Sequence, residues 1–342
     1  MAVHNGAWTD EMADITLSLA CTLSDRTRPI LDGHVPVPGC RLIPLSGEPE
    51  DIFRRALRDQ AFDISELSMG SHIVTTARGD SHYVGVPVFP SRAFRHSGIF
   101  VRTDRGIAGP EDLKGRRIGL PEYQQTAAMW VRGILADRHG IGPEDVTWVV
   151  GSQEQAGGTE RVAVTLPARI KVERIEPSDT LNGLLAAGDL DAIVTPRPPS
   201  CFVARSAPVD RLFPDYPAAE ADYFRATGFF PIMHCIAVRR EIAAAHPWLP
   251  LELFRAFSRA KAGALAELQL VNVLRVSLPW VAAHFEATRA VLGPNPWPYG
   301  FGANRDEIAA MTSYAAADGL ASRVVDPAEL FHPSTLAEVE AA

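Results

Sequence analysis

Short apolar runs alternate with segments of helical periodicity along this chain. Residues 15–20 are typical of a buried strand, and residues 62–67 predict another. A helix is expected to begin within residues 27–32, and a second one to occupy residues 48–58. The second helix carries apolar side chains on one face, at Ile52, Phe53, Ala56 and Leu57. This order of elements predicts an α/β fold.

The segment between residues 115 and 140 predicts a strand, a turn and a helix. Residues 116–120 are expected to form the strand and residues 121–123 the turn, after which the helix runs to about residue 139. Gly140 stands where a left-handed C-terminal residue is favoured. The apolar positions of the helix follow the spacing i, i+3, i+4, i+7, i+8, at Ala127, Trp130, Val131, Ile134 and Leu135.

The beginning of that helix, residues 124–126, is a candidate binding element. In open α/β sheets, ligands bind beyond the carboxyl ends of the strands. Because the strand leads into this helix, the first backbone N–H groups of the helix are expected to face the crevice. Free N–H groups and the helix dipole both favour a negatively charged ligand. The sequence therefore predicts an anion-binding position here.

A second unit with the same order of elements follows. The segments ALRDQAFDISELS and LLAAGDLDAIVTPR align helix with helix and Asp63 with Asp191. Such a weak internal repeat is what two similar lobes leave behind, although chance also produces it at this length. In the second half of the chain, helices are predicted at 180–187, 251–273 and 304–320. A strand is predicted at 190–195 and a loop at 294–299.

The chain has no low-complexity tract or long linker, so we expect two lobes joined by short crossing strands near residues 94–101 and 235–239. Each lobe is predicted to be a mostly parallel sheet flanked by helices, with a cleft between the lobes. Residues 1–97 and 236–342 are assigned to the first lobe, and residues 98–235 to the second.

Composition and charge narrow the classes of partner. The net charge of −8 argues against nucleic acid, because a phosphate-binding surface needs excess lysine and arginine. No apolar run has the length of a signal peptide or of a membrane span, so a cytoplasmic protein without a membrane partner is expected. The cysteines show no CxxC spacing, which favours reduced thiols over zinc ligands.

Several longer stretches carry a resemblance to known families. The phrase GPEDLKGRRIGL resembles the segment that opens the second lobe of type II periplasmic binding proteins. Five further stretches resemble the 4,5-dihydroxyphthalate decarboxylase family: FPSRAFRHSGIFVRTDRGI, GLPEYQQTAAMWVRGIL, LFPDYPAAEADYFRATGFFPIMH, SLPW and WPYGFGANR. The resemblance covers about residues 15 to 335. The resemblance implies a periplasmic-binding-protein-like fold and a cytoplasmic enzyme of aromatic catabolism. Its activity would be loss of one carboxylate to give protocatechuate.

Two places depart from the family pattern beside the expected cleft. The family has Ser-Ser-Tyr where this chain has Gly70-Ser71-His72, and Ala-Arg-Pro where this chain has Pro196-Arg197-Pro198. A related hydroxy-phthalate or isophthalate therefore remains an alternative substrate. The partner expected in either case is a small aromatic dicarboxylate, and a homo-oligomer is left open.

The implied reaction sets the requirements of the site. A hydroxyl para to the carboxylate donates electron density, a proton adds to the carbon that bears the carboxylate, and CO2 then leaves. The protein must supply cations or amides for two carboxylates, a general acid for the ring carbon and an acceptor for the phenol. No cofactor is required.

Three residues are candidates for the proton transfers. His234 follows the second crossing, and imidazole titrates near neutral pH. Glu122 precedes the anion-favouring helix and is either an acid or a capping carboxylate. His96 lies in the first crossing and contacts the ligand or merely holds the hinge.

Arginines and polar residues near the predicted cleft are candidates for substrate binding. Arg197 ends a predicted strand and offers a planar fork for a carboxylate, unless it forms an interlobe salt bridge. Arg95 lies in the first crossing. The other candidates, each of which has a purely structural alternative, are Glu66, Ser68, His72, Gln124, Thr126, Tyr223 and Thr227.

Other activities are less well supported. A divalent metal held by His72, His96, His234 and Glu66 is an alternative, although no HxH or HxxxH spacing supports it. A solute-binding or sensor protein would use the same cleft without turnover. A relative of the thiamine-pyrimidine synthases would carry a cysteine-rich segment that this sequence lacks.

Overall fold

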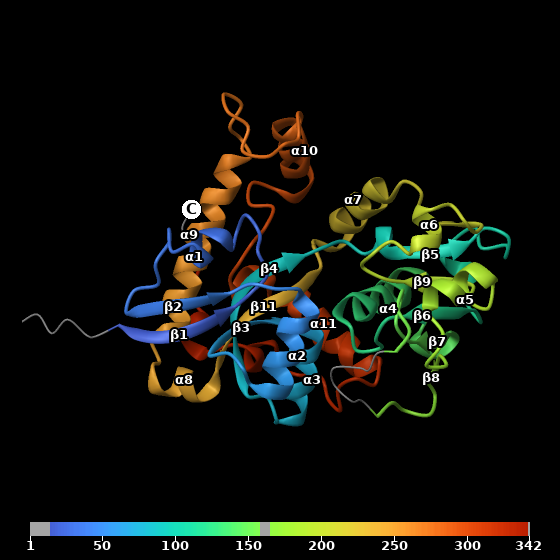
Figure 1. Ribbon diagram of the computed structural model, residues 1–342, viewed down its shortest axis with the longest axis horizontal. Helices are drawn as coiled ribbons and strands as arrows, with labels where there is room; N and C mark the ends of the chain where they lie inside the picture. Colours follow the sequence, from blue (N-terminus) through green and yellow to red (C-terminus); the bar gives the residue numbers. More distant parts are fainter. Residues whose placement is uncertain (1–13, 158–164, 341–342) are drawn as a thin grey trace, which may run out of the picture.

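The computed structural model describes residues 14–157 and 165–340, which form two β-sheets flanked by helices (Figure 1). The first sheet has the strand order β2-β1-β3-β11-β4. Its strands are β1 (Ile15–Ala20), β2 (Cys40–Leu45), β3 (Ile64–Ser68), β4 (Tyr83–Arg92) and β11 (Ile232–Arg239). β1 pairs in parallel with β2 and β3, whereas β11 lies antiparallel between β3 and β4.

The second sheet has the strand order β10-β5-β9-β6-β7-β8. Its strands are β5 (Ile99–Arg102), β6 (Arg117–Leu120), β7 (Thr147–Val150), β8 (Lys171–Arg174), β9 (Ala192–Val194) and β10 (Val209–Arg211). Strands β9, β6, β7 and β8 are parallel, and β5 runs against its neighbours β9 and β10. Both sheets are mixed because β5 and β11, the strands that follow the two crossings, enter antiparallel to the strands beside them.

The weak sequence repeat corresponds to a shared arrangement of the two sheets. Asp63 stands just before β3, and its carboxylate accepts the Ser18 N–H of β1 at 2.9 Å. Asp191 stands just before β9, and its carboxylate accepts the Arg117 N–H of β6 at 3.0 Å. Each aspartate therefore ties the start of its own strand to the parallel neighbour, which accounts for the alignment of the two segments.

Helices flank both sheets (Figure 1). Their bounds are α1 (Arg28–Leu31), α2 (Pro49–Asp59), α3 (Met69–Arg78), α4 (Thr126–His139), α5 (Leu181–Ala187), α6 (Ser200–Val203), α7 (Tyr216–Thr227), α8 (Arg240–Ala245), α9 (Leu249–Glu267), α10 (Val281–Leu292) and α11 (Phe301–Ala317). The predicted helices correspond to α1, α2, α4, α5, α9 and α11 with shifted ends. In the described ranges no helix is long and apolar enough to cross a membrane.

The lobes are joined by two crossings of unequal length. The first lies between β4, which ends at Arg92, and β5, which begins at Ile99, so the expected boundary at residue 97 falls inside it. The second boundary, expected after residue 235, falls inside β11. All of β11 pairs with strands of the first sheet, and the return crossing comes earlier, in the segment that contains α7.

A buried ion pair fixes the second lobe to the C-terminal part of the first. Arg132 of α4 donates from Nε to Asp318 at 2.7 Å, and the two side chains are 0% and 3% exposed. The hydroxyl of Tyr314 in α11 donates to Asp137 of α4. Helices α4 and α11 therefore lie side by side between the lobes (Figure 1).

Candidate active site

A cavity of about 260 Å³ lies between the lobes, at the carboxyl ends of β3 and β4. The first lobe contributes the beginning of α2, the ends of β3 and β4, and the beginning of β11. The second lobe contributes the beginning of α4 and the residues that follow β9. The lining residues are Pro49, Glu50, Phe53, Ser68, Ser91, Arg95, Gln125, Thr126, Ala127, Pro196, Arg197, Met233 and His234.

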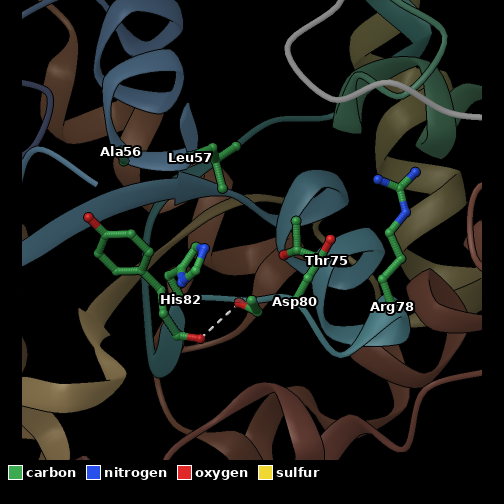
Figure 2. Close-up of a pocket in the computed structure, with 8 residues that line it drawn as sticks. Ala56, Leu57, Thr75, Arg78, Asp80 and His82 are labelled. Atoms are coloured by element: carbon green, nitrogen blue, oxygen red, sulfur yellow. Dashed lines mark hydrogen bonds between the residues drawn. The ribbon is translucent and has the colours of Figure 1, made fainter. Parts of the chain in front are cut away.

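A second cavity, of about 210 Å³, lies at the opposite ends of the strands in the first lobe (Figure 2). The last turns of α2 and α3 and the start of β4 surround it, with Arg78 and His82 among the lining side chains. None of the residues predicted for the site reaches it. Because ligands of α/β sheets bind at the carboxyl ends of strands, the interlobe cavity is the candidate site.

His234 is the titratable side chain placed best for proton transfer in the interlobe cavity. It lies on β11 opposite Ser68 of β3, and its ring packs edge-on against Phe53 at 4.7 Å between centroids. Nδ1 lies 2.6 Å from Oε1 of Glu66, whose side chain is fully buried. This contact fixes the ring orientation and leaves Nε2 for the cavity.

Glu66 acts on the site through His234. Its second oxygen accepts the N–H and the hydroxyl of Thr22 at 2.7 and 2.6 Å. Burial alone would raise the pKa of Glu66, but the hydrogen bonds from His234 and Thr22 outweigh burial and hold that pKa below its ordinary value. The expectation that Glu66 binds substrate is corrected, because both of its oxygens are used behind the imidazole and it does not line the cavity.

Arg95 supplies a cation to the same cavity. Its Nε donates to the Met233 sulfur at 3.1 Å, a weak acceptor. Burial lowers the pKa of Arg95 to about 10, so the guanidinium remains charged at neutral pH. In the described part of the chain no carboxylate lies within 4.0 Å of Arg95, although Glu220 stabilises its charge from farther away. No direct ion pair therefore competes with an anionic ligand for this guanidinium.

The start of α4 faces the cavity, as the sequence predicts. Gln125, Thr126 and Ala127 line it. Among the described residues no side chain caps this helix, and its first turn has no acidic residue, so the first backbone N–H groups are available to a ligand. Ser68 and Thr126 join the two lobes here through their hydroxyls, which lie 2.8 Å apart. Both residues therefore belong to the cavity, as predicted.

Arg197 lies at the exposed rim of the cavity. Its Nη2 is 3.2 Å from Glu48 and 3.3 Å from Glu50, and its side chain is 64% exposed. The interlobe salt bridge weighed from the sequence is thus present. A carboxylate of a ligand would have to compete with two glutamates for this guanidinium.

Glu122 and Gln124 lie outside the cavity lining. The Gln124 amide nitrogen donates to Glu122 at 3.2 Å, and its oxygen accepts the Ser71 hydroxyl at 2.8 Å. Gln124 is fully buried and connects α3 with the segment before α4. It therefore holds the two lobes together rather than a ligand, because both ends of its amide already have partners.

Four other predicted residues also lie away from the cavity. His72 is fully buried and pairs through Nε2 with the Leu330 carbonyl at 2.8 Å. His96 packs against Phe213 and Tyr223 beneath α7. Thr227 donates to the backbone carbonyl of Tyr223. These side chains support the fold around the site, since helical and crossing positions alone do not decide which way a side chain points.

Stability is expected to fall as pH drops from 6.5 towards 4. Burial lowers the pKa of both His72 and His96 from 6.5 to about 4, so each is neutral in the folded state and binds a proton on unfolding within that window. Each contributes a slope of up to about 1.4 kcal/mol per pH unit to the dependence of the free energy of unfolding on pH.

Unfolding by denaturant at several pH values measures this slope. His96→Phe should reduce it, whereas substitution of the exposed His284 should not; equal slopes in both variants would contradict the assignment.

The geometry does not support the alternative that a divalent metal ion is bound by the three histidines and Glu66. Among residues 14–157 and 165–340, no three histidine, cysteine, aspartate or glutamate side chains come together as a group that could hold a metal ion. The set weighed from the sequence is dispersed, because His72 and His96 face other parts of the fold than the His234–Glu66 pair.

Several cavity residues were not predicted from the sequence. Glu50 and Phe53 were assigned only to a helix, and Ser91 and Met233 carry no distinctive chemistry. Gln125 lies within the helix start that was singled out, but its neighbours Gln124 and Thr126 were chosen instead. The one available signal was position, since Glu50 and Gln125 stand at the starts of helices and Ser91 near the end of a strand.

Comparisons with known proteins identify relatives that cover most of this chain. A 4,5-dihydroxyphthalate decarboxylase of Comamonas testosteroni is 42% identical over 325 residues, which is 95% of this chain and 98% of that protein. Another of the same name, from Pseudomonas putida, is 47% identical over 218 residues, covering 64% and 84%. A family model described as NMT1/THI5 like matches residues 93–180.

Solved structures with the same fold are periplasmic binding proteins. The aliphatic sulphonate binding protein SsuA of Escherichia coli superposes with a TM-score of 0.55 at 14% identity, covering 95% of this chain and all of that one. A sulfonate-binding protein of Methylobacillus flagellatus gives a TM-score of 0.57 at 13% identity, covering 94% and 93%. These likenesses confirm the two-lobed fold.

Proposed function

The chain belongs to the 4,5-dihydroxyphthalate decarboxylase family, and from this premise we propose that its interlobe cavity removes one carboxylate of 4,5-dihydroxyphthalate to give protocatechuate. The protein is accordingly a carboxy-lyase. The observation that carries the proposal is the convergence of the His234–Glu66 pair and the unpaired Arg95 on one cavity.

The buried part of the cavity is proposed to hold the dicarboxylate edge of the substrate. The Arg95 guanidinium and the free N–H groups at the start of α4 are the donors that carboxylates prefer. The hydroxyls of Ser68 and Thr126 lie beside them, and because one donates to the other, the pair adds one neutral donor. A carboxylate held there is drawn out of water, and its negative charge is balanced by a cation that forms no direct ion pair with the described residues.

His234 is proposed to deliver the proton to the ring carbon. In the imidazolium form, Nδ1 donates to Glu66 and Nε2 carries a proton into the cavity. The para hydroxyl pushes electron density into the ring, and the carbon that bears the carboxylate takes the proton from Nε2. The bond from this carbon to the carboxylate then breaks, its electron pair returns to the ring, and CO2 leaves. Solvent restores the proton on His234.

The purified protein is expected to release CO2 and protocatechuate from 4,5-dihydroxyphthalate without an added cofactor. Protonation at carbon needs only an acid and an electron-rich ring, so treatment with EDTA should leave the rate within about twofold. Liquid chromatography of the product and trapping of CO2 measure the reaction. Tight binding without turnover would instead indicate a sensor. Loss of activity in EDTA that a divalent ion restores would contradict the metal-free mechanism.

The proposal includes a cytoplasmic location, as expected from the sequence. The four cysteines are free thiols, and Cys21, Cys201 and Cys235 are buried among apolar side chains. This use of cysteine suits a reducing compartment. A catabolic substrate would reach the protein after uptake into the cell.

A further inference from the structure

Two carboxylates share one guanidinium at the rim of the interlobe cavity. Nη2 of Arg197 lies 3.2 Å from Oε2 of Glu48 and 3.3 Å from Oε2 of Glu50. Glu50 and Arg197 line the cavity, whereas Glu48 does not. The side chains are well exposed, Glu50 at 48% and Arg197 at 64%. Since two negative charges oppose one positive charge, the rim as a whole is acidic.

An acidic rim is unsuited to a substrate carboxylate. The Glu50 carboxylate can only accept hydrogen bonds, and like charges at short range repel. A phenolic O–H is the opposite case, because it is a neutral donor that matches a carboxylate oxygen. The rim chemistry therefore selects a hydroxyl group on the ligand, in contrast to the interior, where Arg95 and the start of α4 select an anion.

The proposed substrate has these two chemistries on opposite edges of its ring. The carboxylates occupy positions 1 and 2, and the hydroxyls occupy positions 4 and 5, so each hydroxyl is para to a carboxylate. With the dicarboxylate edge at the buried Arg95, the hydroxyl edge points towards the exposed rim. One orientation of the ring satisfies both ends of the cavity.

We infer that Glu50 accepts a hydrogen bond from a ring hydroxyl and thereby selects hydroxylated phthalates over phthalate itself; this inference rests on the proposed function. Arg197 and the first turn of α2 hold the Glu50 carboxylate in place. A hydroxyl that donates to a carboxylate becomes more electron-releasing. The same contact therefore assists protonation of the para carbon.

Binding measurements in a variant without turnover test the inference independently of catalysis. The background is His234→Gln, and the ligands are 4,5-dihydroxyphthalate and phthalate, which has both carboxylates but no hydroxyl. Adding Glu50→Gln should weaken 4,5-dihydroxyphthalate at least tenfold and leave phthalate within about threefold, because the charge-assisted hydrogen bond is worth roughly that factor or more. Titration calorimetry measures both affinities.

Glu48→Gln in the same background is the matched control. Glu48 contacts the same Arg197 nitrogen but does not line the cavity, so the affinities for both ligands should stay within about twofold of the background. Equal weakening of both ligands by Glu50→Gln would overturn the inference, as would equal effects of the two glutamate variants. Failure of the wild-type protein to produce protocatechuate would instead overturn the proposed function, and the binding comparison would still stand by itself.

Discussion

Replacement of His234 by glutamine is expected to lower kcat by about 10²- to 10⁴-fold, the usual contribution of a positioned general acid. Glutamine keeps much of the side-chain volume beside Phe53 and can still bond Glu66, but it cannot carry a transferable proton. KM should change less than about threefold, because the dicarboxylate is proposed to bind to Arg95 and the start of α4. Steady-state kinetics with protocatechuate as the measured product give both constants.

Two further variants separate a chemical role of His234 from a structural one. His82→Gln changes a histidine that lines the other cavity, and it should leave kcat and KM unchanged (Figure 2). Glu66→Gln should lower kcat less than His234→Gln, because the amide still contacts Nδ1 but removes the negative charge opposite the ring. If His234→Gln lowers kcat by less than about fivefold, or raises KM as much as it lowers kcat, the role of His234 as the acid is wrong.

Replacement of Arg95 by methionine is expected to raise KM by about 10- to 100-fold, with a smaller change in kcat. A hydrogen bond between charged groups contributes roughly 1.5–3 kcal/mol, which corresponds to this range. Methionine retains the apolar stem that packs beside Met233 and removes only the charge. Because Arg95 forms no direct ion pair in the described part of the chain and interacts with Glu220 only at longer range, its removal should break no salt bridge.

The comparison with Arg197→Met decides between the two arginines. Arg197 already contacts Glu48 and Glu50 at the exposed rim, so its loss should raise KM less than loss of Arg95. Thermal unfolding of both variants provides the control for stability. A larger rise in KM for Arg197→Met would restore the sequence-based prediction that Arg197 is the principal ligand of a substrate carboxylate.

The interlobe ties limit how far the lobes can separate. Helix α4 contributes its first turn to the cavity, and further along it is held to α11 and Asp318 through Arg132. The anion-binding end of the site is therefore anchored to both lobes. A preorganised position for a carboxylate next to the His234–Glu66 pair favours catalysis, because little rearrangement is needed once substrate is bound.

Local chemistry was sufficient for much of the fold and part of the site. The strand at 15–20, the amphipathic α2 and the helix α4 with its terminal Gly140 all follow from neighbouring residues. The exposure of the α4 start to the cavity follows from the rule that ligands bind at the carboxyl ends of strands. Helix α3 was missed because polar residues such as Ser71, His72 and Thr76 are buried in it, so its apolar residues do not follow a helical period.

The sequence by itself determined the family, the two-lobed α/β class and the positions at which polar side chains could meet. Only the tertiary structure decided their roles. Glu66 contacts His234, which lies 168 residues away in the sequence, and Arg197 contacts Glu50, which lies 147 residues away. Such pairs depend on how the two sheets pack against each other, and periodicity within one element contains no information about a partner that distant. For that reason the sequence could not rank these candidates. The structure distinguishes His234 from its buried partner Glu66, and Arg95 from Arg197, which is already paired with glutamates.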